Sequence, residues 1–184
     1  MISSFLLNSF KSFRGVTMKK KMSESYSVKS AIVFPQHTNN YNTMFGGMLL
    51  SQIDDIAAIT ARRHSGAQTV TASIDSMDFL RPIELGDIVI LEGVVTYTGR
   101  SSMEIMVKVS RENHSEEGKI LTGFCFMTFV AVDENGKPLE VPEIECDSET
   151  LKFLYDTAEI RVNRRKERLE HTKELAEYIE KQLF

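Results

Sequence analysis

The 184-residue sequence has no tryptophan, few cysteines and prolines, and no long apolar run. Its two cysteines, Cys125 and Cys146, are too few for a disulfide framework and form no Cys-x-x-Cys pair, which also argues against zinc. No apolar segment approaches the roughly 20 residues that a membrane-spanning helix needs. The net charge of −4 provides no general basic surface for nucleic acid. We therefore expect one soluble cytoplasmic domain with a hydrophobic core and with no nucleic-acid or membrane partner.

Two further kinds of site are missing from the sequence. The four histidines, His37, His64, His114 and His171, are scattered and show no spacing typical of metal ligands. No Gly-x-Ser-x-Gly segment is present, so a serine nucleophile is not indicated. Catalysis, if the chain has any, is therefore expected to use other side chains and no metal.

Residues 1–25 differ in composition from the rest of the chain. They carry five basic residues and one acidic residue, and their apolar segment is too short for a secretory signal. Three interpretations remain open: an internal translation start at Met18 or Met22, preceded by a ribosome-binding site; a targeting segment; or an ordinary disordered extension. We prefer the internal start, and we assign these residues to an extension outside the folded domain.

The sequence from residue 26 to residue 140 predicts one long helix and five strands. Apolar residues recur with a period of 3.6 in the helical segment and mostly alternate in the strands, which end at turn-forming residues. We expect a helix that starts near Gly46-Gly47 and stops before Gly66, and strands at 26–34, 69–80, 87–98, 102–110 and 120–132. This order, with hairpin-length connections between the last four strands, predicts an α+β domain in which an antiparallel sheet packs on a single helix.

Two details of this prediction concern side-chain direction. The strand at 69–80 alternates Val70, Ala72 and Ile74 toward the core and then changes phase, which predicts a bulge near Asp75. The helix carries apolar residues on both faces, so most of its sides are expected to be covered.

Residues 141–184 are expected to form a helical tail. Segments 151–158 and 164–183 predict two helices, with Asn163 as the cap of the second. The second helix carries an apolar stripe of Leu169, Leu175, Ala176, Ile179 and Leu183. From residue 161 to residue 173 there are six basic residues and two acidic ones, which fits either a phosphate-binding surface or a solvated helix face with i, i+4 ion pairs.

Asp54 is the sharpest chemical signal in the sequence. It lies about two turns into the predicted helix, among leucine, isoleucine and alanine residues. A carboxylate there is costly unless it is paired, hydrogen-bonded or exposed to a cavity, so Asp54 is either satisfied structurally or lines a site. The neighbouring Asp55 points about 100° away around the helix and is expected to face solvent or an ion-pair partner. An asparagine-rich loop and Gly46-Gly47 precede the helix, and backbone N–H groups at such a start favour developing negative charge.

Three segments together resemble a known family. They are T-N-N-Y-N-T-M-F-G-G-M-L-L-S-Q-I-D from residue 38, V-T-A-S-I-D-S-M-D-F-L-R-P-I-E-L-G-D from residue 70 and G-R-S-S-M-E-I from residue 99. In this order and spacing, the region from about residue 26 to residue 132 resembles the hotdog-fold acyl-CoA thioesterases of the broad-specificity bacterial cytosolic type. The resemblance implies a long helix wrapped by a curved antiparallel sheet, edge-to-edge homodimers with active sites at the dimer interface and, often, a trimer of dimers.

The resemblance also implies roles for individual residues. Asn39 matches the family's catalytic asparagine and Asp54 its catalytic aspartate, contributed by opposite subunits, while a backbone N–H at Gly47 polarises the thioester carbonyl. Asp54 acts either as general base or as nucleophile. The residues implied to contact the substrate or its coenzyme A portion are Gly46, Thr71, Arg100, Ser101, Ser102, Arg164, Arg165 and Arg168. Acyl-CoA is the substrate, no cofactor is implied, and the basic tail leaves a nucleotide effector open.

The chain departs from the family pattern at a few positions. Members usually have Asp at His37, a small residue at Asp55, and Gly at Asn42 and at one of Ala57 and Ala58. These departures affect the fine geometry of the loop and the preferred acyl chain more than the reaction, and the chain length itself is not visible in the sequence.

Two rival functions are weighed against hydrolysis. A hotdog dehydratase of fatty-acid synthesis needs a His-Phe-Pro context, which His37 lacks. A non-catalytic acyl-CoA sensor would carry a helix-turn-helix domain before the hotdog, and residues 1–25 are too short for one. The presence of both Asn39 and Asp54 favours the enzyme.

Overall fold

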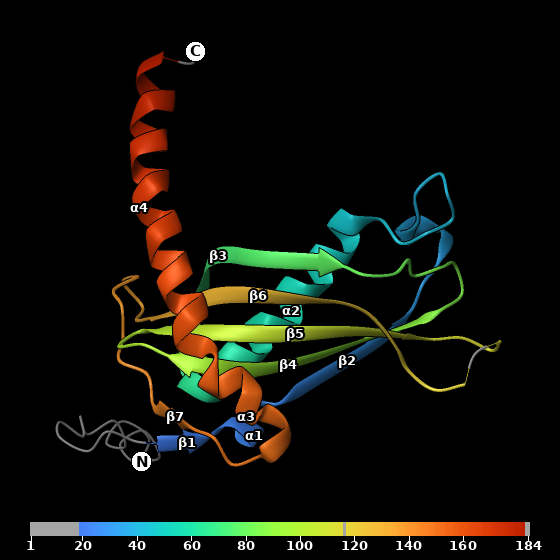
Figure 1. Cartoon of the computed structure of the whole chain (residues 1–184), viewed down its shortest axis with the longest axis horizontal. Helices are drawn as coiled ribbons and strands as arrows, with labels where there is room; N and C mark the ends of the chain where they lie inside the picture. The colour runs from blue at the N-terminus through green and yellow to red at the C-terminus, as the bar shows by residue number, and fades with distance from the viewer. Residues whose placement is uncertain (1–18, 116, 183–184) are drawn as a thin grey trace, which may run out of the picture.

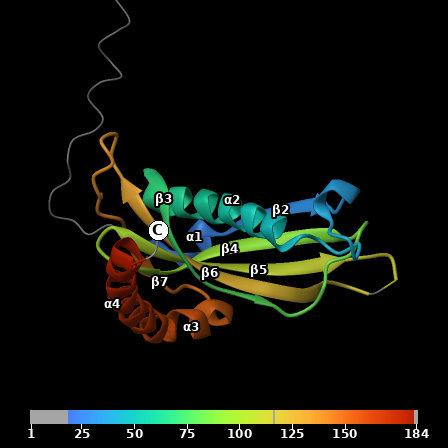
Figure 2. The ribbon, with the colours of Figure 1, turned by 90° about the horizontal axis from the view of Figure 1, so that it is seen from above.

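The computed structural model describes residues 19–115 and 117–182. Its elements are β1 (Lys19–Lys21), α1 (Met22–Ser25), β2 (Ser27–Ile32), η1 (Pro35–His37), α2 (Gly46–Ser65), β3 (Gln68–Phe79), β4 (Ile88–Thr98), β5 (Ser102–Glu112), β6 (Ile120–Val132), β7 (Glu143–Glu145), α3 (Glu149–Asp156) and α4 (Ala158–Gln182). Figures 1 and 2 show α2 along one face of a five-stranded sheet, here called the inner face, and α3 and α4 on the other, outer face. This arrangement confirms the predicted α+β hotdog architecture.

α2 is the element around which the sheet is built. Its apolar stripe is buried against the inner face and consists of Leu49, Ile53, Ile56, Ala57 and Ala61. Gly93 in β4 lets the helix come close, because a Cβ there would lie 2.5 Å from the Thr60 hydroxyl. The helix ends where Gly66 takes a left-handed conformation with φ 67°. Leu50 and Ala58 on the other side of α2 are half-buried and Ile59 is 43% exposed, so the cover predicted for most sides of α2 is incomplete in the single chain.

The sheet is antiparallel, with the strand order β2-β4-β5-β6-β3. β4, β5 and β6 form consecutive hairpins, as the sequence predicts. The short connection from β3 to β4 does not form a hairpin. Instead it crosses the end of the sheet, where the backbone N–H groups of Leu80 and Arg81 donate to Thr122 O at 2.8 and 3.2 Å. β3 therefore pairs with β6 and forms an edge of the sheet.

β3 contains two register shifts against β6, one on each side of Ser73-Ile74. The shift before Ser76 is the bulge that the sequence predicts, whereas the other was not expected. Because a register shift reverses the alternation of side chains, Val70 lies opposite Val130 on the outer face and is 49% exposed. The prediction that Val70 points toward the core is wrong.

The folded body starts before residue 26. Residues 19–25, which the sequence analysis places in an extension, form β1 and α1. β1 pairs in parallel with β7, and the apolar side chain of Met22 is fully buried. Lys20 Nζ donates to His64 O at 2.7 Å, at the carbonyl end of α2 where a cation is favourable. The rest of the expected extension, including Met18, lies outside the described residues.

The C-terminal tail is helical, but its two helices meet at Thr157, so the prediction of a cap at Asn163 is wrong. Thr157 keeps a nearly helical backbone, with φ −92° and ψ −2°, and its hydroxyl donates to Phe153 O at 2.6 Å. α4 therefore begins directly after it, with Asn163 exposed within the helix. The far part of α4 extends away from the body (Figure 1).

Candidate active site

The loop before α2 is organised by the side chain of Asn39. Its Oδ1 accepts hydrogen bonds from the Tyr41 N–H at 2.9 Å and the Thr43 N–H at 3.3 Å, and its Nδ2 donates to Thr43 Oγ1 at 3.0 Å. Asn42 takes a left-handed conformation with φ 59°, which explains why glycine suits this position and why asparagine is tolerated there. The loop is thus a compact turn that delivers the chain to the start of α2.

The start of α2 presents free backbone donors. The first helical hydrogen bond runs from the Leu49 N–H to Phe45 O at 3.0 Å, so Gly46, Gly47 and Met48 have no intrahelical acceptor. The N-cap is Phe45, no side chain caps the helix, and no acidic residue occupies its first turn. The helix dipole and these N–H groups therefore make a site for negative charge.

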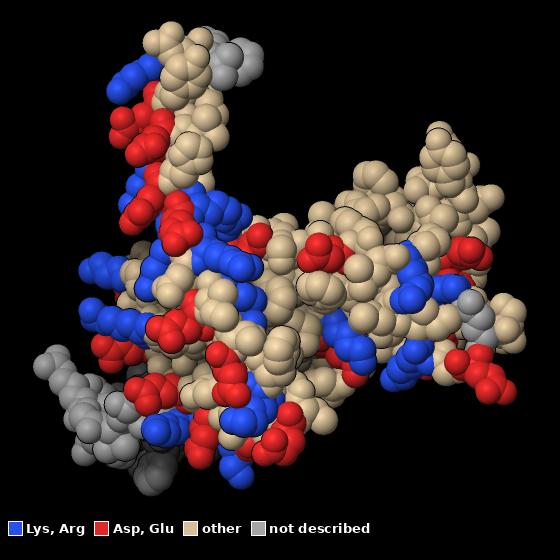
Figure 3. Space-filling view, viewed as in Figure 1, with Lys and Arg blue, Asp and Glu red and all other residues tan. Residues whose placement is uncertain are grey.

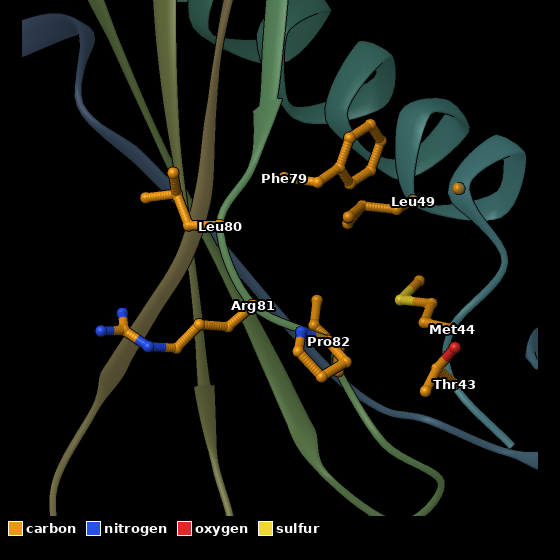
Figure 4. Close-up of a pocket in the computed structure, with 9 residues that line it drawn as sticks. Thr43, Met44, Leu49, Phe79, Leu80, Arg81 and Pro82 are labelled. Atoms are coloured by element: carbon orange, nitrogen blue, oxygen red, sulfur yellow. The ribbon is translucent and has the colours of Figure 1, made fainter. Parts of the chain in front are cut away.

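A cavity of about 310 Å³ opens beside these donors. Figure 4 shows Phe79 and Leu49 at one end of it, Met44 and Thr43 on the side of the loop, and Pro82 opposite. Gly46 also lines the cavity, and a Cβ there would lie 3.6 Å from the Phe79 ring. Apart from Thr43 and Arg81 the lining side chains are apolar, which suits an alkyl or thioester group. Sequence reasoning missed Thr43 and Phe79, because the cavity forms only where the end of β3 meets the loop.

Asp54 is held in place by Thr71. The Thr71 hydroxyl donates to Asp54 Oδ1 at 2.8 Å, and the carboxylate is partly exposed on the side of α2 that faces β3. Asp55 points elsewhere and forms an exposed ion pair with Lys29 at 3.0 Å, as predicted. Asp54 therefore has a neutral hydrogen-bond partner, and its charge is not neutralised by any ion pair among the described residues.

Asn39 and Asp54 do not meet within one chain. Asn39 bonds only within its own turn, and Asp54 lies eight residues, or about 12 Å, beyond the start of α2. No hydrogen bond joins the two side chains in the described part of the chain. The predicted pair is thus present, but a single protomer does not assemble it.

The Gly99 to Ser102 turn lies at the same end of the sheet as Thr71. Ser102 pairs with Val130, which pairs with Val70, so the turn is two strands away from β3. Arg100 is exposed and forms a surface ion pair with Glu140 at 3.2 Å, while Ser101 and Ser102 are half-buried. These residues are accessible, and they do not contact Asp54 in the chain.

The three arginines of the tail lie on the outer face, with the sheet between them and Asp54. Arg165 and Arg168 reach Asp75 of β3 at 3.5 and 2.6 Å, and Arg164 makes no ion pair with any described residue. Their expected role in binding coenzyme A therefore has no support from one chain alone.

Sequence reasoning missed the acidic partners of these arginines, although one of them, Glu104, is recognisable as a carboxylate inside an alternating strand. Glu104 is 1% exposed and bonds to Arg161 at 2.8 Å.

Other chemistries find little support in the described residues. They contain no cluster of three or more histidine, cysteine, aspartate or glutamate residues suited to a metal. Burial, together with the nearby carboxylates, raises the pKa of Cys125 to about 12, so its thiol is a poor nucleophile. No helix in the part that the structure describes is both long and apolar enough to cross a membrane.

Comparisons with known proteins agree with this geometry. The model of the thioesterase superfamily matches residues 41–117. The uncharacterized acyl-CoA thioester hydrolase YkhA of Bacillus subtilis is 51% identical over 153 residues, which cover 83% of this chain and 89% of that protein. A hexameric acyl-CoA thioesterase is similar in structure, with a TM-score of 0.80 and 45% identity over 83% of this chain and 97% of its own.

The acyl-CoA hydrolase of Staphylococcus aureus gives the most detailed comparison. Its structure with butyryl coenzyme A, coenzyme A and coenzyme A disulfide has a TM-score of 0.85 and 48% identity, covering 88% of this chain and 98% of that chain. Structures of the same enzyme include variants in which an aspartate, an asparagine and a threonine are replaced by alanine. On these matches of sequence and structure, the chain belongs to the hotdog-fold thioesterase superfamily.

Proposed function

We propose that the protein hydrolyses the thioester bond of acyl-CoA and releases a fatty acid and coenzyme A. The main support is the start of α2, where uncapped N–H groups open onto a mostly apolar cavity on the same helix that carries Asp54. The relatives that match most of the chain are acyl-CoA hydrolases. Because these relatives are named as hydrolases, the alternative of a non-catalytic acyl-CoA sensor is not favoured. We place the enzyme in the cytoplasm, in line with its composition.

The geometry supports a division of labour between the start of α2 in one copy and Asp54 of the other copy. The Gly47 N–H, with Gly46 beside it, donates to the thioester oxygen as it becomes an oxyanion, and the nearby loop of Asn39 in the same copy supplies an amide. Asp54 of the other copy takes a proton from water, whose oxygen attacks the carbonyl carbon. The carbon–sulfur bond then breaks, and the thiolate leaves and takes up the proton. Alternatively the Asp54 carboxylate attacks the carbon itself, and water hydrolyses the resulting anhydride.

Asn39, Asp54 and Thr71 are proposed to act together, because the same three residue types were replaced by alanine in a related hydrolase. The asparagine, aspartate and threonine replaced in the Staphylococcus aureus hydrolase have the same spacing along the chain as Asn39, Asp54 and Thr71. The Thr71 hydroxyl, which bonds to Asp54 at 2.8 Å, is then a positioning group for the carboxylate.

The complete site is proposed to form between two copies of the chain. β3 is an edge strand with Val70 and Ile74 exposed, and Ile59 on α2 is exposed as well. An edge of this kind pairs readily with a second edge, and such pairing covers the open side of α2. It would place Asn39 of one copy near Asp54 of the other. Three such dimers would give a hexamer, the form named for two related thioesterases.

Coenzyme A is proposed to lie along accessible polar groups at the rim of this interface. Arg100, Ser101 and Ser102 are the nearest candidates, with Arg164 as a further cation. Arg165 and Arg168 are engaged by Asp75 and would have to exchange that partner for phosphate. A nucleotide effector that binds the same arginines is also proposed.

Thiol release from acetyl- to palmitoyl-CoA tests the function directly. We expect turnover of at least part of this series and a fall in kcat of about 10²- to 10⁴-fold for Asp54→Asn, the range for loss of a general base. Asp55→Asn, which removes only an exposed ion pair on the other side of the helix, is the matched control and should stay near wild type. No release from any acyl-CoA, or wild-type kcat in Asp54→Asn, would overturn the proposal.

A further inference from the structure

Two exposed apolar surfaces lie away from the start of α2 and from Asp54. The first, which we call the outer groove, runs between the outer face of the sheet and the α3–α4 pair and encloses about 600 Å³. Its apolar lining includes Met106, Leu121, Phe124, Phe126, Phe153 and Ile160. Phe153 is 74% exposed and Ile160 54%, so apolar side chains stand open to solvent at its mouth. Such a surface is unusual on a chain that works alone.

The second surface, which we call the distal stripe, lies on the part of α4 that leaves the body. Leu169, Leu175, Ala176 and Ile179 fall within an arc of about 120° around the helix at 100° per residue. The three larger side chains are 43%, 49% and 40% exposed. This is the stripe that the sequence predicts, and among the described residues it has nothing to pack against. Figure 1 shows this part of the helix standing clear of the sheet.

The distal stripe cannot fill the outer groove of its own chain. Arg161, near the start of α4, lines the groove, and Leu175 lies 14 residues further along the same unbroken helix. At 1.5 Å per residue the separation is about 21 Å, directed away from the groove. Any contact between the two surfaces must therefore join different copies.

The far part of α4 and the outer groove also carry opposite net charge, although only Glu180 borders the distal stripe and the other acidic residues lie on the far side of the helix. The part of α4 from residue 169 to residue 182 has four acidic residues and two lysines, namely Glu170, Glu174, Glu177, Glu180, Lys173 and Lys181. The outer groove is edged by Lys108, Arg161 and Arg164, and it contains no acidic lining residue. Figure 3 shows acidic side chains along the far part of α4 and basic side chains where α4 meets the body.

We propose that the distal stripe of one copy docks into the outer groove of a second copy. This is the helix-in-groove mode, in which an amphipathic helix lays its apolar face into an apolar channel. The contact joins two different surfaces, so it is heterologous and closes only as a ring. A ring of three, built on pairs joined through β3, contains six chains. The contact would thus hold dimers together, and it is independent of the chemistry proposed for Asp54.

Light scattering on the full-length protein tests the docking through both surfaces. We expect Leu175→Glu with Ile179→Glu to lower the molar mass threefold, from six chains to two. Phe153→Glu with Ile160→Glu, on the groove side, should do the same. Lys181→Glu changes charge on the opposite side of α4 and should stay hexameric. Circular dichroism melts check that each variant is folded. Either double variant remaining hexameric while folded, or a wild type that is not hexameric, would overturn the proposal.

Cross-linking separates docking from a pairing of two tails. A mixture of Leu175→Cys chains and Phe153→Cys chains should form a disulfide between unlike chains under mild oxidation. Leu175→Cys alone should form none at that position. A disulfide between two Leu175→Cys chains, with groove variants still hexameric, would show that the tails pair with each other and would contradict the docking.

Discussion

The two faces of the sheet are held to their helices by different forces. On the inner face, α2 is sealed by apolar side chains, among them Met103, Ile105 and Phe129 of the sheet, each at most 1% exposed. On the outer face, α4 buries Ala158 and Val162 near its start and is also fastened by charge, because Arg161 donates to Glu104 and Arg168 to Asp75. The apolar contacts fix the position of α2 and therefore of its first residues and Asp54. The ionic contacts instead position the first part of α4, whose far part extends away from the body.

Because of this difference, we expect substitutions on the two faces to affect different properties, turnover on one and stability on the other. Changes at the polar groups that α2 carries should alter turnover and spare stability. Changes in the outer ion pairs should alter stability and spare the chemistry of each intact site. The predictions below follow this division from the largest expected effect to the smallest.

The loop before α2 should give the largest effect. Asn39→Asp keeps an oxygen that can accept the Tyr41 and Thr43 N–H groups but removes the amide donor and adds negative charge. We expect kcat to fall by about 10²- to 10³-fold, the usual cost of losing one oxyanion donor, with little change in melting temperature. Asn39→Ala removes the turn contacts as well and should also lower the melting temperature. Near-normal kcat in Asn39→Asp would assign Asn39 to loop structure alone.

The buried pair on the outer face should give the next effect. Arg161→Leu leaves Glu104, which is 1% exposed, without its main cation. We expect a loss of about 3 kcal/mol in unfolding free energy, the lower end of the range for broken buried pairs because Arg161 is itself partly exposed. Urea unfolding of the wild type and of Arg161→Leu measures this difference in unfolding free energy.

A matched control lies on α3. Lys152→Ala breaks an exposed i, i+4 pair with Asp156 and should leave the unfolding free energy close to that of wild type. Adding Glu104→Leu to Arg161→Leu should recover part of the loss, because the unpaired carboxylate is then gone. An equal loss in Lys152→Ala and Arg161→Leu would contradict the distinction between buried and exposed pairs.

A smaller, pH-dependent effect is expected at the far end of α2. Burial of His64 lowers its pKa below the ordinary 6.5, and Lys20 acts in the same direction, while the hydrogen bond between Nε2 and Pro142 O at 2.8 Å opposes the shift. Below about pH 6.5, His64 is protonated in the unfolded chain but stays neutral in the folded chain. The contribution of His64 is therefore absent above this pH and destabilising as the pH falls through it.

Glutamine provides the control for this prediction. Its amide can donate to Pro142 O but does not titrate, so His64→Gln should lose less stability than wild type between pH 7 and pH 5.5. Melting temperature against pH measures the difference. Identical slopes in the two proteins would show that His64 does not carry the effect.

Much of the fold and of the site was visible in the sequence, for physical reasons. The 3.6-residue period of α2 and the alternation in β5 reflect apolar burial, which acts on each element locally. Asp54 stands out as a carboxylate within an apolar helix, and the double glycine as a helix start, whereas the role predicted for Asn39 comes from the resemblance to the thioesterase family. The end of α2 at Gly66 follows from a left-handed turn that few other residues accept.

Other features depend on contacts between segments far apart in the chain. The crossing of residues 80–87 from β3 past β6 and β5 to β4 is fixed by where β6 lies, not by the short connection itself. The first shift in β3, which reversed Val70, is set by its pairing with β6. The use of Asp75 as the partner of Arg168 needs the fold of the tail. Periodicity contains none of this information.

Mixing two inactive variants tests the central claim, that one active site takes Asn39 and Asp54 from different copies. Asn39→Ala and Asp54→Asn chains are unfolded, mixed in equal amounts and refolded together. Random pairing makes half of the dimers mixed, and each mixed dimer has one intact site, so about a quarter of wild-type activity should return, while each variant refolded alone stays inactive. If the mixture is no more active than the average of the two variants, both residues act from the same chain and the account is wrong.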